Sequence, residues 1–121
     1  MDRFQAIHSF WASFGIPAFN KYAVPDIAAL PYLTYDTAIG SIDDIIPLNA
    51  TIYYGGTLLD NLSKKTEEIY KKIVNDDPVT IEFEGGYLWI YKSGIFAQDM
   101  PSDSDNVKSK LITVYAEFIT K

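Results

Sequence analysis

The chain contains one histidine, His8, and histidine is the side chain best suited to move protons near neutral pH. Ser9 and Ser13 lie close to it in sequence, so a serine nucleophile with a histidine base is the first chemistry to consider. Many hydrolases of that kind hold the serine in a Gly-x-Ser-x-Gly turn, and the sequence has no such turn. His8 also stands at the edge of an apolar helix face, between Ile7 and Trp11. We therefore interpret it as a structural histidine and predict no catalytic residue.

A run of acidic and amide side chains suggests a calcium-binding loop: Asp99, Asp103, Asp105 and Asn106. The loop template fails when it is started at Asp103. It places Lys108 where the template needs glycine and Val114 where it needs a bidentate glutamate. A solvated loop is the favoured interpretation, with an irregular cation site as the lesser alternative. We assign no metal ligand.

The remaining polar patterns also lack the features of an active site. Glu82, Glu84 and Glu117 alternate with apolar residues, which is typical of solvent-facing strand positions rather than of paired carboxylates in a cleft. Gly55-Gly56 precedes a helix, but no lysine follows at the spacing of a phosphate-binding loop. These observations predict a protein that is not an enzyme and has no cofactor.

Composition narrows the class of protein further. The chain has 121 residues, of which 48% are hydrophobic and 21% charged, and this favours one globular domain over residues 1–121. The chain has sixteen acidic and ten basic residues. The resulting formal net charge of -6 disfavours binding to nucleic acid or anionic lipid. The absence of cysteine excludes disulfides and thiolate sites. We expect no signal peptide, because the apolar run after Met1 is short and interrupted, and no membrane span.

Hydrophobic periodicity predicts two helices. The first covers residues 3–14, with Asp2 as its N-cap and Gly15 as the left-handed residue that ends it. The second covers residues 57–75 and begins at a capping box, Thr57 to Asp60. Its predicted buried stripe is Leu58, Leu62, Ile69 and Ile73, with Thr66 between the middle pair.

Alternation predicts about five strands, at 32–39, 48–54, 79–84, 87–91 and 112–118. The turn at 40–47 makes the first two a hairpin, and Gly85-Gly86 makes the next two another. Two segments are expected to be irregular: the proline-containing residues 16–31 and the loop 93–106. The resulting fold class is α+β, with two helices packed on one face of a mostly antiparallel sheet in the order α-β-β-α-β-β-β.

The chain is rich in aromatic residues, with nine tyrosines, seven phenylalanines and two tryptophans. Tyrosine and tryptophan bury large areas at low entropic cost, which suits protein interfaces. The strand at 87–91 is apolar on both faces and therefore needs cover on both. We predict that the following residues contact other subunits or partners: Tyr22, Val24, Tyr53, Tyr91, Ile95, Phe96 and Met100. The alternative is that they only pack under loops.

Several blocks of the sequence resemble small tail-completion proteins of long-tailed bacteriophages and prophages. They are Phe10-Trp11, Gly15-Ile16-Pro17-Ala18, Val24-Pro25, Pro31-Tyr32-Leu33-Thr34-Tyr35, the helix at 65–73, Gly86-Tyr87-Leu88-Trp89-Ile90 and Phe96-Ala97-Gln98. The order of elements is similar to that of tail terminator proteins. The blocks cover most of the chain, and they are structural rather than catalytic.

The resemblance implies a structural virion-assembly protein. In that family, a ring, usually a hexamer, caps the tail tube and joins it to the head connector. Self, the tail tube protein and the head-tail connector protein are then the expected partners. The expected locations are the virion tail and, during assembly, the cytoplasm of the bacterial host. Two alternatives stay open: another phage neck or tail component of similar size, or a small-ligand-binding or regulatory domain with an apolar pocket beside Trp89.

Overall fold

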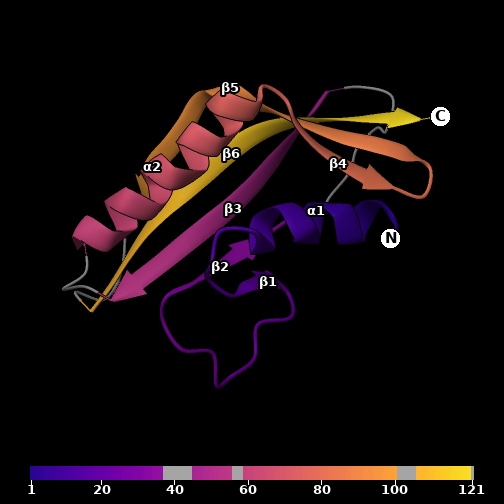
Figure 1. The fold of residues 1–121 in the computed structure, drawn as a ribbon. Coiled ribbons are helices and arrows are strands. Elements are labelled where there is room, and N and C mark those ends of the chain that lie inside the picture. Colours follow the sequence, from indigo (N-terminus) through magenta and orange to yellow (C-terminus); the bar gives the residue numbers. More distant parts are fainter. Residues whose placement is uncertain (37–44, 56–58, 101–105, 121) are drawn as a thin grey trace.

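The structure is a computed structural model that describes residues 1–36, 45–55, 59–100 and 106–120 (Figure 1). It has an α+β fold in which two helices accompany a six-stranded sheet. In chain order the elements are α1 (Arg3–Ala12), β1 (Ala18–Asn20), β2 (Tyr32–Tyr35), β3 (Ile46–Gly55), α2 (Leu59–Asp76), β4 (Val79–Phe83), β5 (Gly86–Met100) and β6 (Val107–Thr120). The strands lie side by side in the order β1-β2-β3-β6-β5-β4. All neighbours are antiparallel except β1 and β2, which are parallel.

The fold class and both helices agree with the sequence prediction, whereas the strand count and element order do not. The structure describes six strands instead of about five, because a short strand, β1, lies within the segment 16–31 that was expected to be irregular. Its residues Ala18 to Asn20 pair with Leu33 to Tyr35. This pairing joins residues fifteen positions apart, and alternation within three residues cannot reveal it.

The predicted loop at 93–106 is the second correction. Strand β5 continues to Met100, past a register shift between Lys92 and Ala97, and pairs with β6 as far as Ser109. Strand β6 is correspondingly longer than predicted, because it must pair with this extension on one side and with β3 on the other. A bulge interrupts the alternation of apolar and polar residues, so the sequence pattern predicts that the strand ends at the bulge.

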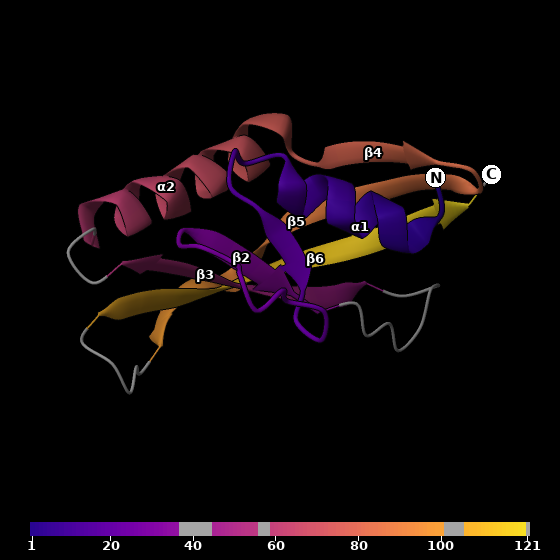
Figure 2. The ribbon, with the colours of Figure 1, turned by 90° about the horizontal axis from the view of Figure 1, so that it is seen from below.

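Both helices cover the same face of the sheet (Figure 2). Helix α1 buries Ala6, Ile7, Phe10 and Trp11 there. Helix α2 buries Leu62, Ile69 and Ile73, the predicted stripe as far as the structure describes it, since Leu58 lies outside the described residues. From the sheet, alternate residues point inward to meet them, including Leu48, Ile52, Leu88, Ile90, Ile112 and Val114. The result is a single core between the two helices and one sheet face.

The start of α1 follows the predicted chemistry. The Asp2 carboxylate accepts a hydrogen bond from the backbone N–H of Gln5, and the Gln5 side chain accepts one from the N–H of Asp2, both at 2.8 Å. Gly15 has the predicted left-handed φ, +81°, but α1 already ends at Ala12 with Ser13 as its C-cap, so Gly15 does not itself end the helix. The predicted capping residue of the second helix, Thr57, lies outside the described residues.

Candidate interaction surface

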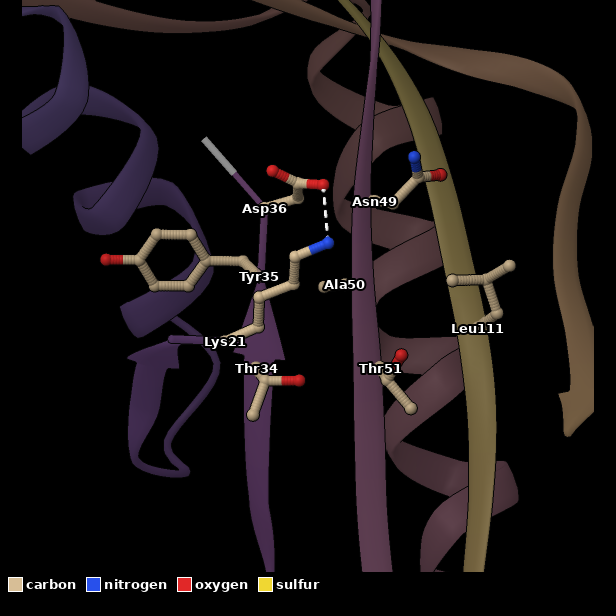
Figure 3. A pocket seen from close by; sticks show the side chains of 8 residues that line it. All are labelled: Lys21, Thr34, Tyr35, Asp36, Asn49, Ala50, Thr51 and Leu111. Carbon is tan, nitrogen blue, oxygen red and sulfur yellow. Dashed lines mark hydrogen bonds and ion pairs between the residues drawn. The ribbon is translucent and has the colours of Figure 1, made fainter. Parts of the chain in front are cut away.

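The face of the sheet opposite the helices carries a continuous set of aromatic and polar side chains. We call it the open sheet face, and its members include Phe19, Tyr32, Thr34, Asn49, Thr51, Tyr53, Tyr87, Trp89, Tyr91, Met100, Leu111, Thr113, Tyr115, Glu117 and Ile119. Most are half-buried against their neighbours, and Tyr115 is 42% exposed. Because alternate residues of a strand point to opposite faces, these side chains cannot reach the core. Figure 3 views this face, with α2 behind the sheet.

One end of the open sheet face, which we call the Tyr53 end, consists of Phe19, Tyr32, Tyr53 and Met100. The Tyr32 ring lies 5.9 Å from the ring of Phe19 and 5.2 Å from that of Tyr53. Tyr53 and Met100 both pair with Ser109, from the two sides of β6, and so point to the same face. The Met100 side chain is 39% exposed. This end is therefore apolar and accessible.

The other end, which we call the Trp89 end, consists of Trp89, Tyr91, Tyr115 and Glu117. Trp89 lies directly across from Glu117, and Tyr91 lies directly across from Tyr115. The rings of Trp89 and Tyr91 are nearly perpendicular, with centroids 6.5 Å apart. The Tyr91 hydroxyl donates a hydrogen bond of 3.4 Å to Glu117 Oε2. Burial, with the nearby Glu117 carboxylate as a lesser cause, raises the pKa of Tyr91 above its ordinary value.

A hollow of about 240 Å³ lies between the two ends, with Lys21, Thr34, Asp36, Asn49, Thr51 and Leu111 around it (Figure 3). Its charged groups pair with each other, since Lys21 Nζ donates to Asp36 Oδ2 at 2.9 Å. That hydrogen bond is the main reason why the pKa of Lys21 is raised. Thr113 Oγ1 donates to Asn49 Oδ1 at 2.8 Å. A hollow whose charged groups are already satisfied is better suited to solvent than to catalysis.

The predicted interface residues divide into three groups. Tyr53, Tyr91 and Met100 lie on the open sheet face. Tyr22 and Val24 belong to the segment between β1 and β2, where Tyr22 is 84% exposed and Val24 is half-buried. Phe96 instead packs against the core, with its ring 5.4 Å from that of Tyr70 on α2. The Ile95 side chain lies outside the described residues.

Sequence reasoning left five aromatic members of the open sheet face out of the predicted interface: Phe19, Tyr32, Tyr87, Trp89 and Tyr115. A signal for Trp89 was present in the two-faced strand at 87–91, which indicated cover on both sides. Tyr115 alternates with core residues and stands among polar neighbours, so its position resembled an ordinary solvent-facing one. What distinguishes it is the cross-strand partner Tyr91, which only the sheet register supplies.

Three of the residues considered for catalysis and metal binding, His8, Ser13 and Asp99, each contact a different partner. His8 Nδ1 is 2.8 Å from the hydroxyl of Tyr35, and Ser13 Oγ donates to the carbonyl oxygen of Phe10. Asp99 pairs with Lys110, while Asp103 and Asp105 lie outside the described residues. Within the described part of the chain, no three acidic or histidine side chains gather as a metal site would require.

No protein-family model matches this chain, and no curated protein matches it either. In the described ranges, no helix is both long and apolar enough to span a membrane. The geometry of the open sheet face is therefore the main structural observation that bears on function.

Proposed function

We propose that this chain is a structural assembly protein that packs its open sheet face against other protein chains. Its sequence resemblance favours the role of a phage tail terminator, a ring that caps the tail tube and joins it to the head connector. The observation that carries the proposal is the sheet itself: one face is covered by both helices (Figure 2), and the other presents aromatic side chains from five strands, most of them half-buried. Tyrosine and tryptophan are enriched where proteins meet.

A second apolar surface supports a ring rather than a simple dimer. We call it the 22–30 segment, the part of the β1–β2 connection that extends away from the sheet in Figure 1. Ile27 is 92% exposed there and Leu30 is 39% exposed. This surface lies at the β1 edge of the sheet, whereas Met100 lies on β5, on the far side of β3 and β6. Two different patches on one subunit allow head-to-tail contacts, and such contacts close into rings.

The proposed contact places the 22–30 segment of one copy on the Tyr53 end of the next. The resemblance favours six copies in the ring, with the tail tube protein and the head connector as further partners. The net charge of -6 also suits a ring through which DNA passes, because acidic groups along its channel repel phosphate.

Sedimentation velocity with negative-stain microscopy, over a range of concentrations, tests self-association directly. The natural chain is expected to form closed oligomers, and Ile27→Asp or Met100→Asp is expected to prevent them, because each buries a charge in the contact. Val74→Asp is the matched control, since Val74 is 44% exposed on α2, outside both surfaces. A natural chain that stays monomeric at every concentration, with and without the tail tube protein, contradicts the proposal.

A mixing experiment tests the head-to-tail geometry. Each of the two variants keeps one intact surface, so Ile27→Asp and Met100→Asp chains mixed together are expected to form dimers that grow no further. A contact of identical patches gives a different result, because one of the two variants then keeps the whole contact surface. That variant would form dimers on its own, without the other chain.

The hollow beside Lys21 favours the second candidate function, a small-ligand-binding or regulatory domain. That function needs no ring, and its ligand must compete with the Lys21–Asp36 ion pair. A monomer whose thermal stability rises with a small polar metabolite, and falls back in Asp36→Asn, supports this alternative over assembly.

A further inference from the structure

Glu117 is a carboxylate set among aromatic rings at the Trp89 end. Its side chain is half-buried, and the hydroxyl of Tyr91 reaches it only at the long distance of 3.4 Å. Within the described residues, none of the five ion pairs involves Glu117. A half-buried carboxylate without a cation beside it costs free energy, and a cation from outside the chain relieves that cost.

The groups around Glu117 favour an arginine side chain as that cation. The faces of tryptophan and tyrosine rings attract cations, and Trp89, Tyr91 and Tyr115 supply three such rings. A guanidinium group is planar, so it can stack on a ring while donating two parallel hydrogen bonds to a carboxylate. A lysine ammonium makes a point contact and is more strongly hydrated, so it gains less from the same surroundings.

A second copy of this chain cannot easily supply the arginine. The sequence contains one arginine, Arg3, on the covered side of the sheet. The Arg3 guanidinium carbon lies 5.3 Å from the centre of the Phe83 ring and 5.8 Å from that of Phe118. Its Nε is buried. To present Arg3 to a neighbour, the chain must remove this side chain from contacts that it makes at the N-terminal end of α1.

We infer that Trp89, Tyr91, Tyr115 and Glu117 form a binding site for an arginine side chain presented by a protein chain of different sequence. The inference rests on the proposed use of the open sheet face in assembly, and it names the partner of one end of that face. The Tyr53 end then contacts a neighbouring copy, while the Trp89 end contacts a different protein with a basic surface. The chain's own net charge of -6 favours a basic partner at long range as well.

The test follows the indole N–H resonance of Trp89 in nitrogen–proton spectra during titration with the peptide acetyl-Gly-Arg-Gly-amide at low salt. Trp11 is fully buried, so its indole resonance is an internal reference. The arginine peptide is expected to shift the Trp89 resonance. The corresponding citrulline peptide, which has the same shape without the charge, is expected to leave it in place, and the lysine peptide is expected to bind several-fold more weakly.

The matched pair of variants is Glu117→Gln and Glu67→Gln, which remove one negative charge each. Glu117→Gln is expected to weaken binding about fivefold. Glu67→Gln, at an exposed position on α2, is expected to leave binding unchanged. The inference is overturned by an absent Trp89 shift, by equal binding of the citrulline or lysine peptide, or by unchanged binding in Glu117→Gln.

Failure of this inference is separable from failure of the proposed ring. The titration is repeated on the Met100→Asp chain, in which the proposed contact between copies is broken. Arginine binding that depends on Glu117, in a natural chain that never self-associates, supports the site and contradicts the ring. Rings in the natural chain without a Trp89 shift in either chain support the ring and contradict the site.

Discussion

Lys65 of α2 donates a hydrogen bond of 2.6 Å from its Nζ to the backbone carbonyl oxygen of Phe14, just beyond the end of α1. The same ammonium group contacts the Glu68 carboxylate at 3.2 Å, and the Lys65 side chain is only 16% exposed. Carbonyl groups near the C-terminal end of a helix lack partners within the helix, and a positive charge there is stabilising. This contact ties the two helices together above the sheet.

Replacing Lys65 by methionine is expected to lower the free energy of unfolding by about 1–2 kcal/mol, because a partly buried carbonyl loses a charged donor. Methionine keeps much of the apolar stem, so the change isolates the ammonium group. Urea denaturation measures the effect. Lys64→Met, at an exposed neighbour, is the control, and equal stability of the two variants contradicts a role for the Phe14 contact.

Gly86 and Gly94 are both glycines of β5, yet substitution by alanine is expected to affect them differently. Gly86 has a φ of +155°, and a Cβ atom built on it lies 1.8 Å from the carbonyl oxygen of Ile119 on β6. No heavy atom outside the neighbouring residues lies within 4 Å of a Cβ at Gly94. Gly86→Ala is expected to lower stability by about 3 kcal/mol or more, since backbone must move to admit the methyl group. Gly94→Ala is expected to stay within about 0.5 kcal/mol of the natural chain. Thermal unfolding of the two variants measures the difference in stability. Similar losses of stability in both variants contradict the close approach of Ile119 to Gly86.

The fold is expected to lose stability at alkaline pH because burial raises the pKa of Tyr35 and Tyr54 above the ordinary 10.0. In the unfolded chain these hydroxyls lose their protons near the ordinary value, whereas the folded chain holds them to higher pH. Their contribution is therefore complete below about pH 10 and is lost as pH rises through the folded pKa values. Urea denaturation between pH 9 and 11 measures the decline, with both limits about one unit from the ordinary value. Tyr54→Phe is expected to reduce the decline in the free energy of unfolding over this pH range. Tyr22→Phe, at an exposed side chain, serves as the control. An identical decline in Tyr54→Phe contradicts the assignment.

Phe96→Asp and Met100→Asp are expected to separate packing from assembly, although both positions belong to the predicted interface. Phe96 contacts Tyr70 and the core, so a carboxylate there is expected to cost about 2–4 kcal/mol of stability. Met100 is 39% exposed, so its variant is expected to stay within about 0.5 kcal/mol of the natural chain while losing self-association. Denaturation and sedimentation of the same samples measure the two effects. A strongly destabilised Met100→Asp chain places Met100 in the core instead.

Local patterns in the sequence were sufficient for much of the fold. The apolar spacing of Phe4, Ile7, Trp11 and Phe14 predicted α1, and the last three are buried, whereas Phe4 is 54% exposed. The spacing of Leu62, Ile69 and Ile73 predicted α2 and its buried side. Local patterns were not sufficient where a strand pairs with a segment distant in sequence or where the pairing is irregular. Strand β1 exists because it pairs with β2, and the extension of β5 beyond Lys92 exists because β6 continues beside it. Neither depends on a pattern within its own residues.

The candidate site was predictable only in part, for a related reason. Alternation in β6 established that Ile112 and Val114 share one face and that Tyr115 and Glu117 share the other. It could not establish which strands lie beside β6, and so it could not bring Trp89 opposite Glu117 or Tyr91 opposite Tyr115. Periodicity along one strand is a local property of the chain, whereas the neighbours of a side chain across a sheet are chosen by the packing of the whole domain. The sequence by itself determined two helices, an α+β fold and an excess of aromatic residues. The tertiary structure decided which face both helices cover, and therefore which aromatics remain for a partner.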